Sequence, residues 1–298
     1  MRSKGWTVLV AVVWAAVLCI GAVGAASDPL HIGIVADVHV HDTDSPAEGK
    51  VMVNYAERLT AFVDAMNAWP ADAVFQLGDL VNGAFVLGGL TGDPTRIGAL
   101  LDEGLVLLSG LDAPLYHVLG NHDMYDLSKP EVLAAMGLEQ GAYSFDLGGY
   151  HFVVLDAEFN PDGTPYDHVF MRVKGFIPPG QLDWLTADLA ATNLPTIVAI
   201  HQPLDSDFDS LAGGPPVANH LEVRSVLRDS DVVIAVLQGH DHENRYAEID
   251  GIHYVTFAAM VDHTEPSPPT FAQMTLDPVE RVIRIEGFGL QAAWELPY

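Results

Sequence analysis

The most constraining feature of this chain is an apolar, strand-like run that recurs five times and ends each time in aspartate or histidine. The runs end at Asp37-Val38-His39, Gly78-Asp79, Gly120-Asn121-His122-Asp123, His201 and Gly239-His240-Asp241-His242. Short β-rich runs that stop abruptly in such residues are typical of buried strands that open into turns. In open α/β sheets, ligands and catalytic groups gather at the carboxyl ends of the strands. We therefore expect these polar side chains to meet at one rim.

The segments between these runs predict an α/β fold that also contains β-hairpins. Helical patterns cover approximately residues 51–69, 94–108, 180–192 and 219–228, and a capped helix start lies at Ser128. Hairpin patterns cover residues 142–156, 246–257 and 271–287. Since no internal repeat or low-complexity linker is present, one catalytic domain over residues 27–298 is the simplest partition.

The residue types at the rim indicate a metal site. Asp37 and His39, like His240 and His242, are two positions apart, which places both side chains of a pair on one face of a strand. Carboxylates, imidazoles and one amide oxygen, without sulfur, suit Mn²⁺, Fe or Zn²⁺. The set is too large for one ion and sufficient for two divalent metal ions if they share a carboxylate. Asp79, in a tight Gly-Asp turn, is the natural bridge.

In this order, the five motifs resemble the signature of the calcineurin-like metallophosphoesterase superfamily, over approximately Leu30 to the C-terminus. The resemblance implies a four-layer α/β sandwich of two mixed β-sheets flanked by helices. It assigns one metal to Asp37, His39, Asp79 and His242, and the other to Asp79, Asn121, His201 and His240. It also implies that His122 contacts the scissile phosphate instead of a metal.

The chemistry follows from such a centre. Two cations about 3.5–4 Å apart lower the pKa of a shared water, and the resulting hydroxide attacks phosphorus in a phosphodiester, pyrophosphate or phosphomonoester bond. His122 would assist the leaving group as a general acid. The alternative is a non-catalytic scaffold that uses the same fold, although buried polar ligands are costly to keep without metals.

Three further residues are expected to support the ligands without binding metal themselves. Many members of the superfamily carry a second aspartate where this chain has Asn82, and Gln202 replaces a second histidine after His201. Asp123 is expected to orient its neighbours. His41 and His263 are weaker candidates for contact with the site.

The loops are expected to choose the substrate. Residues 175–177, followed by 181–185, are similar to the subgroup that contains manganese-dependent ADP-ribose/CDP-alcohol diphosphatases and cyclic-nucleotide phosphodiesterases. This similarity implies a small-molecule phosphoester substrate such as a nucleotide; the alternative is a broad-specificity phosphomonoesterase. Basic residues that could hold an additional phosphate are few: Lys50, Arg96, Lys129, Arg172 and Lys174.

Residues 1–26 have the layout of a secretory signal peptide. Arg2 and Lys4 precede the apolar residues 7–22, and small residues follow at Gly24-Ala25-Ala26. We expect a secreted or periplasmic protein with no stable membrane partner; the alternative is an uncleaved membrane anchor. The only cysteine, Cys19, lies within this segment, so a cleaved chain has no disulfide and no thiolate nucleophile.

The charge of −27 argues against nucleic acid as a partner. Binding to a polyanion depends on clustered lysine and arginine that release its counterions, and this chain has 13 basic residues against 40 acidic ones. The sequence leaves the oligomeric state open.

Overall fold

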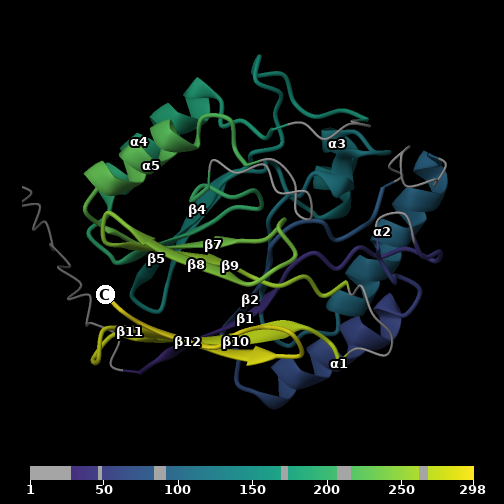
Figure 1. The fold of residues 1–298 in the computed structure, drawn as a ribbon, viewed down its shortest axis with the longest axis horizontal. Coiled ribbons are helices and arrows are strands. Elements are labelled where there is room, and N and C mark those ends of the chain that lie inside the picture. Colours follow the sequence, from purple (N-terminus) through teal and green to yellow (C-terminus); the bar gives the residue numbers. More distant parts are fainter. Residues whose placement is uncertain (1–27, 46–48, 84–91, 169–173, 207–215, 262–267) are drawn as a thin grey trace, which may run out of the picture.

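Two six-stranded β-sheets lie face to face in the computed structural model, which describes residues 28–45, 49–83, 92–168, 174–206, 216–261 and 268–298 (Figure 1). The first sheet has the order β12 (Trp294–Pro297), β11 (Val282–Phe288), β10 (Phe271–Asp277), β1 (Leu30–Val35), β2 (Ala73–Gln76), β3 (Leu115–His117). The second has the order β4 (Tyr143–Leu147), β5 (Tyr150–Val154), β6 (Thr196–Ala199), β7 (Val233–Gln238), β9 (Ile252–Thr256), β8 (Arg245–Ile249).

Each sheet combines a parallel part with antiparallel hairpins. Strands β1, β2 and β3 are parallel, and β10, β11 and β12 extend that sheet in antiparallel pairs. In the second sheet β5, β6, β7 and β9 are parallel, while β4 and β8 pair antiparallel at the two edges. Parallel strands direct their carboxyl ends the same way, which allows residues far apart in sequence to meet at one edge.

A hydrophobic core fills the space between the sheets. Ile34 and Phe75 of the first sheet and Phe152 and Leu237 of the second belong to this core and are fully buried. Alternate residues, such as Val74, point instead to the outer face of the first sheet and join a second core beneath the helices. This period of two explains why the central strands are apolar throughout, since both of their faces are covered.

Helices cover both outer faces, which confirms the predicted four-layer sandwich. Helices α1 (Tyr55–Ala68) and α2 (Pro94–Leu108) pack on the first sheet, and α4 (Pro179–Ala191) and α5 (His220–Asp229) on the second (Figure 1). The Asp93 side chain caps α2 by accepting from the backbone N–H groups of Thr95 and Arg96, and a proline occupies the first turn. The short α3 (Lys129–Ala135) begins where predicted.

Three details differ from the expectations. Helix α1 begins at Tyr55, because Ser45 and Lys50 form an isolated bridge and residues 49–53 belong to a loop. Strand β12 was not predicted. Strands β1, β6 and β7 each end two positions before the candidate ligand that follows, so Asp37, His201 and His240 lie in turns. Within the described ranges, the structure contains no helix of the length and apolarity that a membrane span requires; residues 1–26 lie outside these ranges.

Candidate metal centre

The turns after five parallel strands are joined by backbone hydrogen bonds at one edge of the molecule. The N–H of Asp37 donates to the carbonyl of Gly78 at 3.2 Å, and that of His39 donates to the carbonyl of Asp79 at 3.0 Å. The N–H of His240 donates to both carboxylate oxygens of Asp37, at 3.1 and 3.0 Å. The two sheets therefore meet here through polar contacts, and each supplies part of the site.

Most candidate ligands have a left-handed backbone, which residues other than glycine rarely adopt. The φ angles are 51° at Asp37, 50° at His39, 54° at Asp79, 70° at His240 and 62° at His242. Such strain persists only where the surrounding structure enforces it, and it concentrates at functional sites. The turns thus direct side chains toward a common point at a cost in backbone energy.

Two glycines allow this close approach. A Cβ at Gly78 would lie 2.4 Å from Nδ1 of His201, and a Cβ at Gly120 would lie 2.1 Å from the backbone nitrogen of Asp79. Because neither position has room for a side chain, the Gly-Asp and Gly-Asn pairs of the motifs are geometric requirements of the site.

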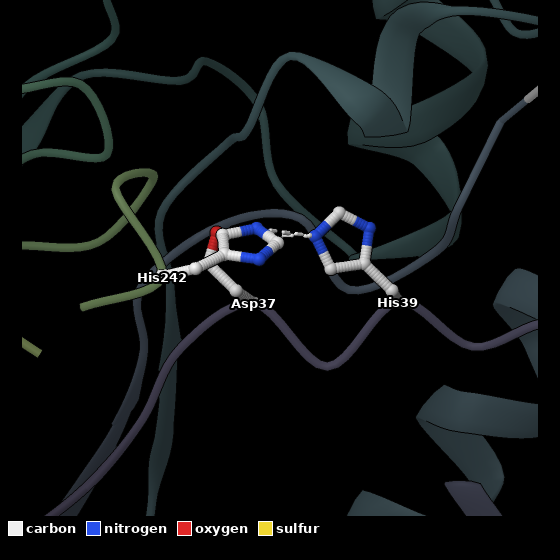
Figure 2. Close-up of side chains that lie close together, drawn as sticks. All are labelled: Asp37, His39 and His242. Carbon is white, nitrogen blue, oxygen red and sulfur yellow. Dashed lines mark hydrogen bonds and ion pairs between the residues drawn. The ribbon is translucent and has the colours of Figure 1, made fainter. Parts of the chain in front are cut away.

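Asp37, His39 and His242 form the first group of side chains that could hold an ion (Figure 2). The Nε2 atoms of His39 and His242 are 3.1 Å apart, and Nε2 of His242 lies 3.5 Å from Oδ1 of Asp37. Nδ1 of His39 donates to Oδ1 of Asn82 at 2.7 Å. This bond places the proton on Nδ1, so Nε2 presents its lone pair to the group.

Asp79, His201 and His240 form a second group. Nε2 of His201 lies 3.2 Å from Oδ2 of Asp79 and 3.2 Å from Nδ1 of His240. Nδ1 of His201 donates to the carbonyl of Leu77 at 2.8 Å, which again leaves Nε2 as the atom that faces the group. Asp79 also lies 3.7 Å from Nε2 of His39, so its carboxylate is positioned between the two groups.

Asn121 provides a test of whether a cation fits this site. Its Nδ2 donates to the hydroxyl of Tyr125 at 2.9 Å, which fixes the orientation of the amide. Its Oδ1 is buried and has no hydrogen-bond partner among the residues that the structure describes. A buried acceptor without a partner costs free energy that a cation would recover. Together with the mixture of carboxylate and imidazole donors, this oxygen fits a divalent metal.

His122 lies closer to the ligands than its expected role requires. It forms a third group with His39 and Asp79, and its backbone N–H donates to Oδ1 of Asp79 at 2.7 Å. Its ring stacks edge-on against that of His39, with the centroids 4.6 Å apart. Nε2 lies 3.5 Å from Nζ of Lys50. Burial, followed by the charge of Lys50, lowers the pKa of His122 well below its usual value.

Burial and the charges of neighbouring side chains shift the pKa values of the cluster in different directions. Burial raises the pKa of Asp37 to about 7. Burial also opposes ionisation of Asp79, but His201 and His122 outweigh it and hold the pKa of Asp79 well below its usual value. Burial opposes the charged form of His201 as well, yet the neighbouring Asp79 raises the pKa of His201 to about 10. The cluster therefore retains protons at the atoms that a metal would occupy, and metal binding would release them.

The three residues expected to support the ligands, Asn82, Asp123 and Gln202, have different hydrogen-bond partners. Asn82 bonds to His39, as described above. The carboxylate of Asp123 accepts from the N–H groups of Val81 and Gly120, each at 3.0 Å, and so joins the turns that carry Asp79 and Asn121. Gln202 instead donates to Oε1 of the fully buried Glu158 at 2.6 Å.

Of the two weaker histidine candidates, the structure describes only His41, which does not join the candidate ligands. Nδ1 of His41 lies 3.1 Å from the backbone nitrogen of Thr43, and His41 belongs to none of the three groups found in the described part of the chain. His263 lies outside the described residues.

Sequence reasoning missed Arg245. Its guanidinium pairs with Asp241, between the candidate ligands His240 and His242, and with Asp205 at 2.7 Å, four residues after His201. It therefore connects the two loops that supply the ligands of the second sheet. No motif or spacing in the sequence indicates this pairing, because strand β8 brings Arg245 to both carboxylates only in the folded chain.

A four-layer α/β sandwich with a rim of candidate aspartate, histidine and asparagine ligands is typical of two-metal phosphoester hydrolases. The chain belongs to the calcineurin-like phosphoesterase family, because the sequence model of that family matches residues 30–244. It is therefore a metal-dependent phosphoric ester hydrolase, as the resemblance predicted.

Individual relatives agree with this assignment. The chain is 27% identical over 322 residues to the manganese-dependent ADP-ribose/CDP-alcohol diphosphatase of Xenopus tropicalis, covering 86% of this chain and 91% of the relative. It is 27% identical over 248 residues to a probable cyclic nucleotide phosphodiesterase of Pseudoalteromonas, covering 80% and 81%. Its fold is similar to that of a dimetal phosphatase from Danio rerio, with a TM-score of 0.76, 22% identity and coverage of 91% and 100%.

Proposed function

We propose that the protein hydrolyses the pyrophosphate bond of a small nucleotide derivative, such as ADP-ribose or a CDP-alcohol, with manganese as the metal. The observation that carries the proposal is the similarity, over nearly the full length, to diphosphatases that are named as manganese-dependent. The complete set of ligand residues at the rim supports catalysis over a scaffold role, because buried carboxylates and imidazoles without a cation are costly.

The residues assigned to two ions share one carboxylate. Asp37, His39, Asp79 and His242 would hold one ion, and Asp79, Asn121, His201 and His240 the other. When bound, the two cations supply an activated water and neutralise charge on the phosphoryl oxygens. Asn82, and the carbonyl of Leu77 beneath His201, fix the imidazole tautomers that present Nε2 to the ions.

His122 is assigned to the leaving group. Its ring contacts those of His39 and Tyr125, with centroid distances of 4.6 and 4.3 Å. In this position it donates a hydrogen bond or a proton to the departing oxygen. Asp79 orients it by accepting its backbone N–H.

A substrate panel tests the proposal. The metal-stripped protein is reloaded with Mn²⁺, Fe²⁺ or Zn²⁺ and assayed on ADP-ribose, cyclic AMP, bis-p-nitrophenyl phosphate and p-nitrophenyl phosphate. We expect the highest kcat/KM on ADP-ribose with Mn²⁺. Turnover of p-nitrophenyl phosphate alone would support the broad phosphomonoesterase instead.

A second candidate function is hydrolysis of a cyclic nucleotide. The Pseudoalteromonas relative covers 80% of this chain and is named as a probable cyclic nucleotide phosphodiesterase. A cyclic phosphodiester needs the same two ions and the same assistance to its leaving oxygen. Preference for cyclic AMP over ADP-ribose in the panel would favour this candidate.

We also propose that the protein acts outside the cytoplasm, because residues 1–26 carry the pattern of a signal peptide. Intact-mass measurement of the exported protein tests this. A mature chain beginning near Ser27 is expected, and a mass that still includes residues 1–26 would support the anchor.

A further inference from the structure

Lys50 places a positive charge inside the site, although it is not a metal ligand. The residue is only 7% exposed. Its Nζ lies 3.2 Å from Oδ1 of Asn82, 3.4 Å from Nδ1 of His39 and 3.5 Å from Nε2 of His122. The ammonium thus lies beside the imidazole that is assigned to the leaving group.

The backbone around Lys50 is anchored on both sides. Its N–H donates to the carbonyl of Ser45 and its own carbonyl accepts from the N–H of Ser45, both at 3.0 Å. On the other side, Oδ1 of Asp44 accepts from the N–H of Met52 at 2.7 Å and from that of Val53 at 3.1 Å. The fold therefore holds the ammonium at this point, in contrast to the freely moving tip of a surface lysine.

The contact with Asn82 adds no negative charge beside the ammonium. Oδ1 of Asn82 accepts from both His39 and Lys50, and this amide oxygen is neutral.

We propose that Lys50 selects pyrophosphate substrates by holding the departing phosphoryl group. This inference rests on the proposed function. The water oxygen forms a bond to the attacked phosphorus and releases a proton to solvent, the bridging P–O bond breaks, and its electron pair leaves with the second phosphoryl group. The ammonium of Lys50 keeps its proton and neutralises that added charge. Simple esters have an uncharged organic group at this place, so they gain little from Lys50.

Activity on two substrates distinguishes selection of pyrophosphates by Lys50 from a general contribution of Lys50 to catalysis. The Mn²⁺-loaded Lys50→Met variant keeps the apolar stem and loses the charge. We expect its kcat/KM on ADP-ribose to fall by about 10- to 100-fold, the range of a lost charge-assisted hydrogen bond, and that on bis-p-nitrophenyl phosphate to change by less than about twofold. Lys50→Arg should recover part of the loss. The control is Arg96→Met, which removes a positive charge that contacts Asp42. It should leave the ratio of the kcat/KM values for the two substrates unchanged.

Ligand binding provides a second readout without turnover. Calorimetry with Mn²⁺-loaded protein compares methylenediphosphonate with inorganic phosphate. Lys50→Met should weaken diphosphonate binding by about 10-fold or more and phosphate binding only slightly, with manganese content unchanged by elemental analysis. If Lys50→Met does not fold, Lys50→Gln is measured in the same way.

The outcomes distinguish the two proposals. Three results for Lys50→Met would overturn the proposed role: an equal loss of affinity for diphosphonate and phosphate, a loss of bound manganese, or unchanged affinity for both ligands. The first two results would show that Lys50 only positions His39 and His122. Failure of the wild-type protein to hydrolyse ADP-ribose would overturn the proposed function, and the diphosphonate measurement would still decide the role of Lys50.

Discussion

At the scale of single residues, the Gly-Asn-His-Asp turn carries a proposed metal ligand and the proposed leaving-group residue within four positions. The side-chain oxygen of Asn121 is buried, Nε2 of His122 lies near Lys50, and the carboxylate of Asp123 connects the turn to that of Asp79. Tyr125 contacts both functional neighbours, through its hydroxyl to Asn121 and through its ring to His122. The functions of the turn can therefore be separated by substitution.

Tyr125→Phe should weaken the binding of one metal. The variant keeps the ring against His122 but loses the hydroxyl that accepts from Nδ2 of Asn121, so the amide is free to rotate its oxygen away. Losing an outer partner of a ligand typically costs about 10- to 100-fold in metal affinity. Calorimetric titration with Mn²⁺ should show one weakened site and one unchanged site. Two unchanged sites would mean that Asn121 needs no such support.

His122→Ala should keep both metals while turnover falls by about 10²- to 10⁴-fold. The loss should be large for a poor leaving group such as an alkoxide and small for p-nitrophenolate, which leaves without a proton. His240→Ala is the matched comparison, because it should lose one metal and affect all substrates equally. Equal losses across leaving groups for His122→Ala would reduce its role to positioning the phosphate.

At the scale of elements, His151 joins the edge of the second sheet to helix α4. On strand β5, its Nδ1 lies 2.6 Å from Oδ1 of Asp146 on β4, and its Nε2 lies 2.9 Å from Oδ2 of Asp188 on the helix. Ser144 also donates to Asp188, at 2.9 Å. Burial opposes charge on this imidazole, but the two carboxylates outweigh it and raise the pKa of His151.

This contact should make stability depend on pH. Since the pKa of His151 is raised by folding, its contribution is complete below the unfolded pKa of about 6.5 and disappears as pH rises through the folded value. His151→Gln should therefore lower the free energy of unfolding by about 1 kcal/mol near pH 6, and by less near pH 9. Denaturant unfolding at both pH values measures the difference. Asp188→Asn should weaken the same pH dependence, and an equal cost for His151→Gln at both pH values would contradict this reading.

At the scale of the whole molecule, the candidate metal centre connects the two sheets. Asp37, His39, Asp79 and Asn121 follow strands of the first sheet, and His201, His240 and His242 follow strands of the second. Ions held by this set would join both halves of the sandwich at one edge. Metal binding is therefore expected to contribute to folding stability as well as to catalysis.

Removal of the metals should lower Tm, and by more as pH rises. In the metal-free protein, burial raises the pKa of Asp37 and of Asp123 to about 7. Because these folded values are raised, the stabilisation by the protonated forms is lost as pH increases from about 4 to about 7. Bound cations would compensate the charge that then develops.

Differential scanning fluorimetry with and without Mn²⁺ measures this linkage. The Tm difference should grow between about pH 4 and about pH 7, the range between the unfolded and folded pKa values of Asp37 and Asp123. Asp79→Ala is the control, since it removes the carboxylate between both ligand groups and should abolish the Tm difference together with metal content and activity. A Tm difference that does not vary with pH would contradict the linkage.

The sequence by itself determined the fold class and the candidate ligands. Strands that are covered on both faces are short, apolar runs in the sequence. Ligands gather at the carboxyl ends of such strands, so polar residues directly after an apolar run, such as Asp37, Asp79 and His201, are recognisable in the sequence. The order of five motifs then restricted the chemistry to that of one superfamily. Local signals also located α2 and α3, because prolines and capping residues act over only a few positions.

Only the tertiary structure decided which side chains meet. Contacts between distant segments determine three features of the site. These are the left-handed backbone at His39 and His242, the ion pairs of Arg245 with two loops, and the ammonium of Lys50 near His122. Strand β12 was missed for the same reason, since it is defined by its pairing with β11. A sequence pattern records local preference and burial. The energy that holds a strained turn or a buried charge comes from neighbours that the linear order does not show.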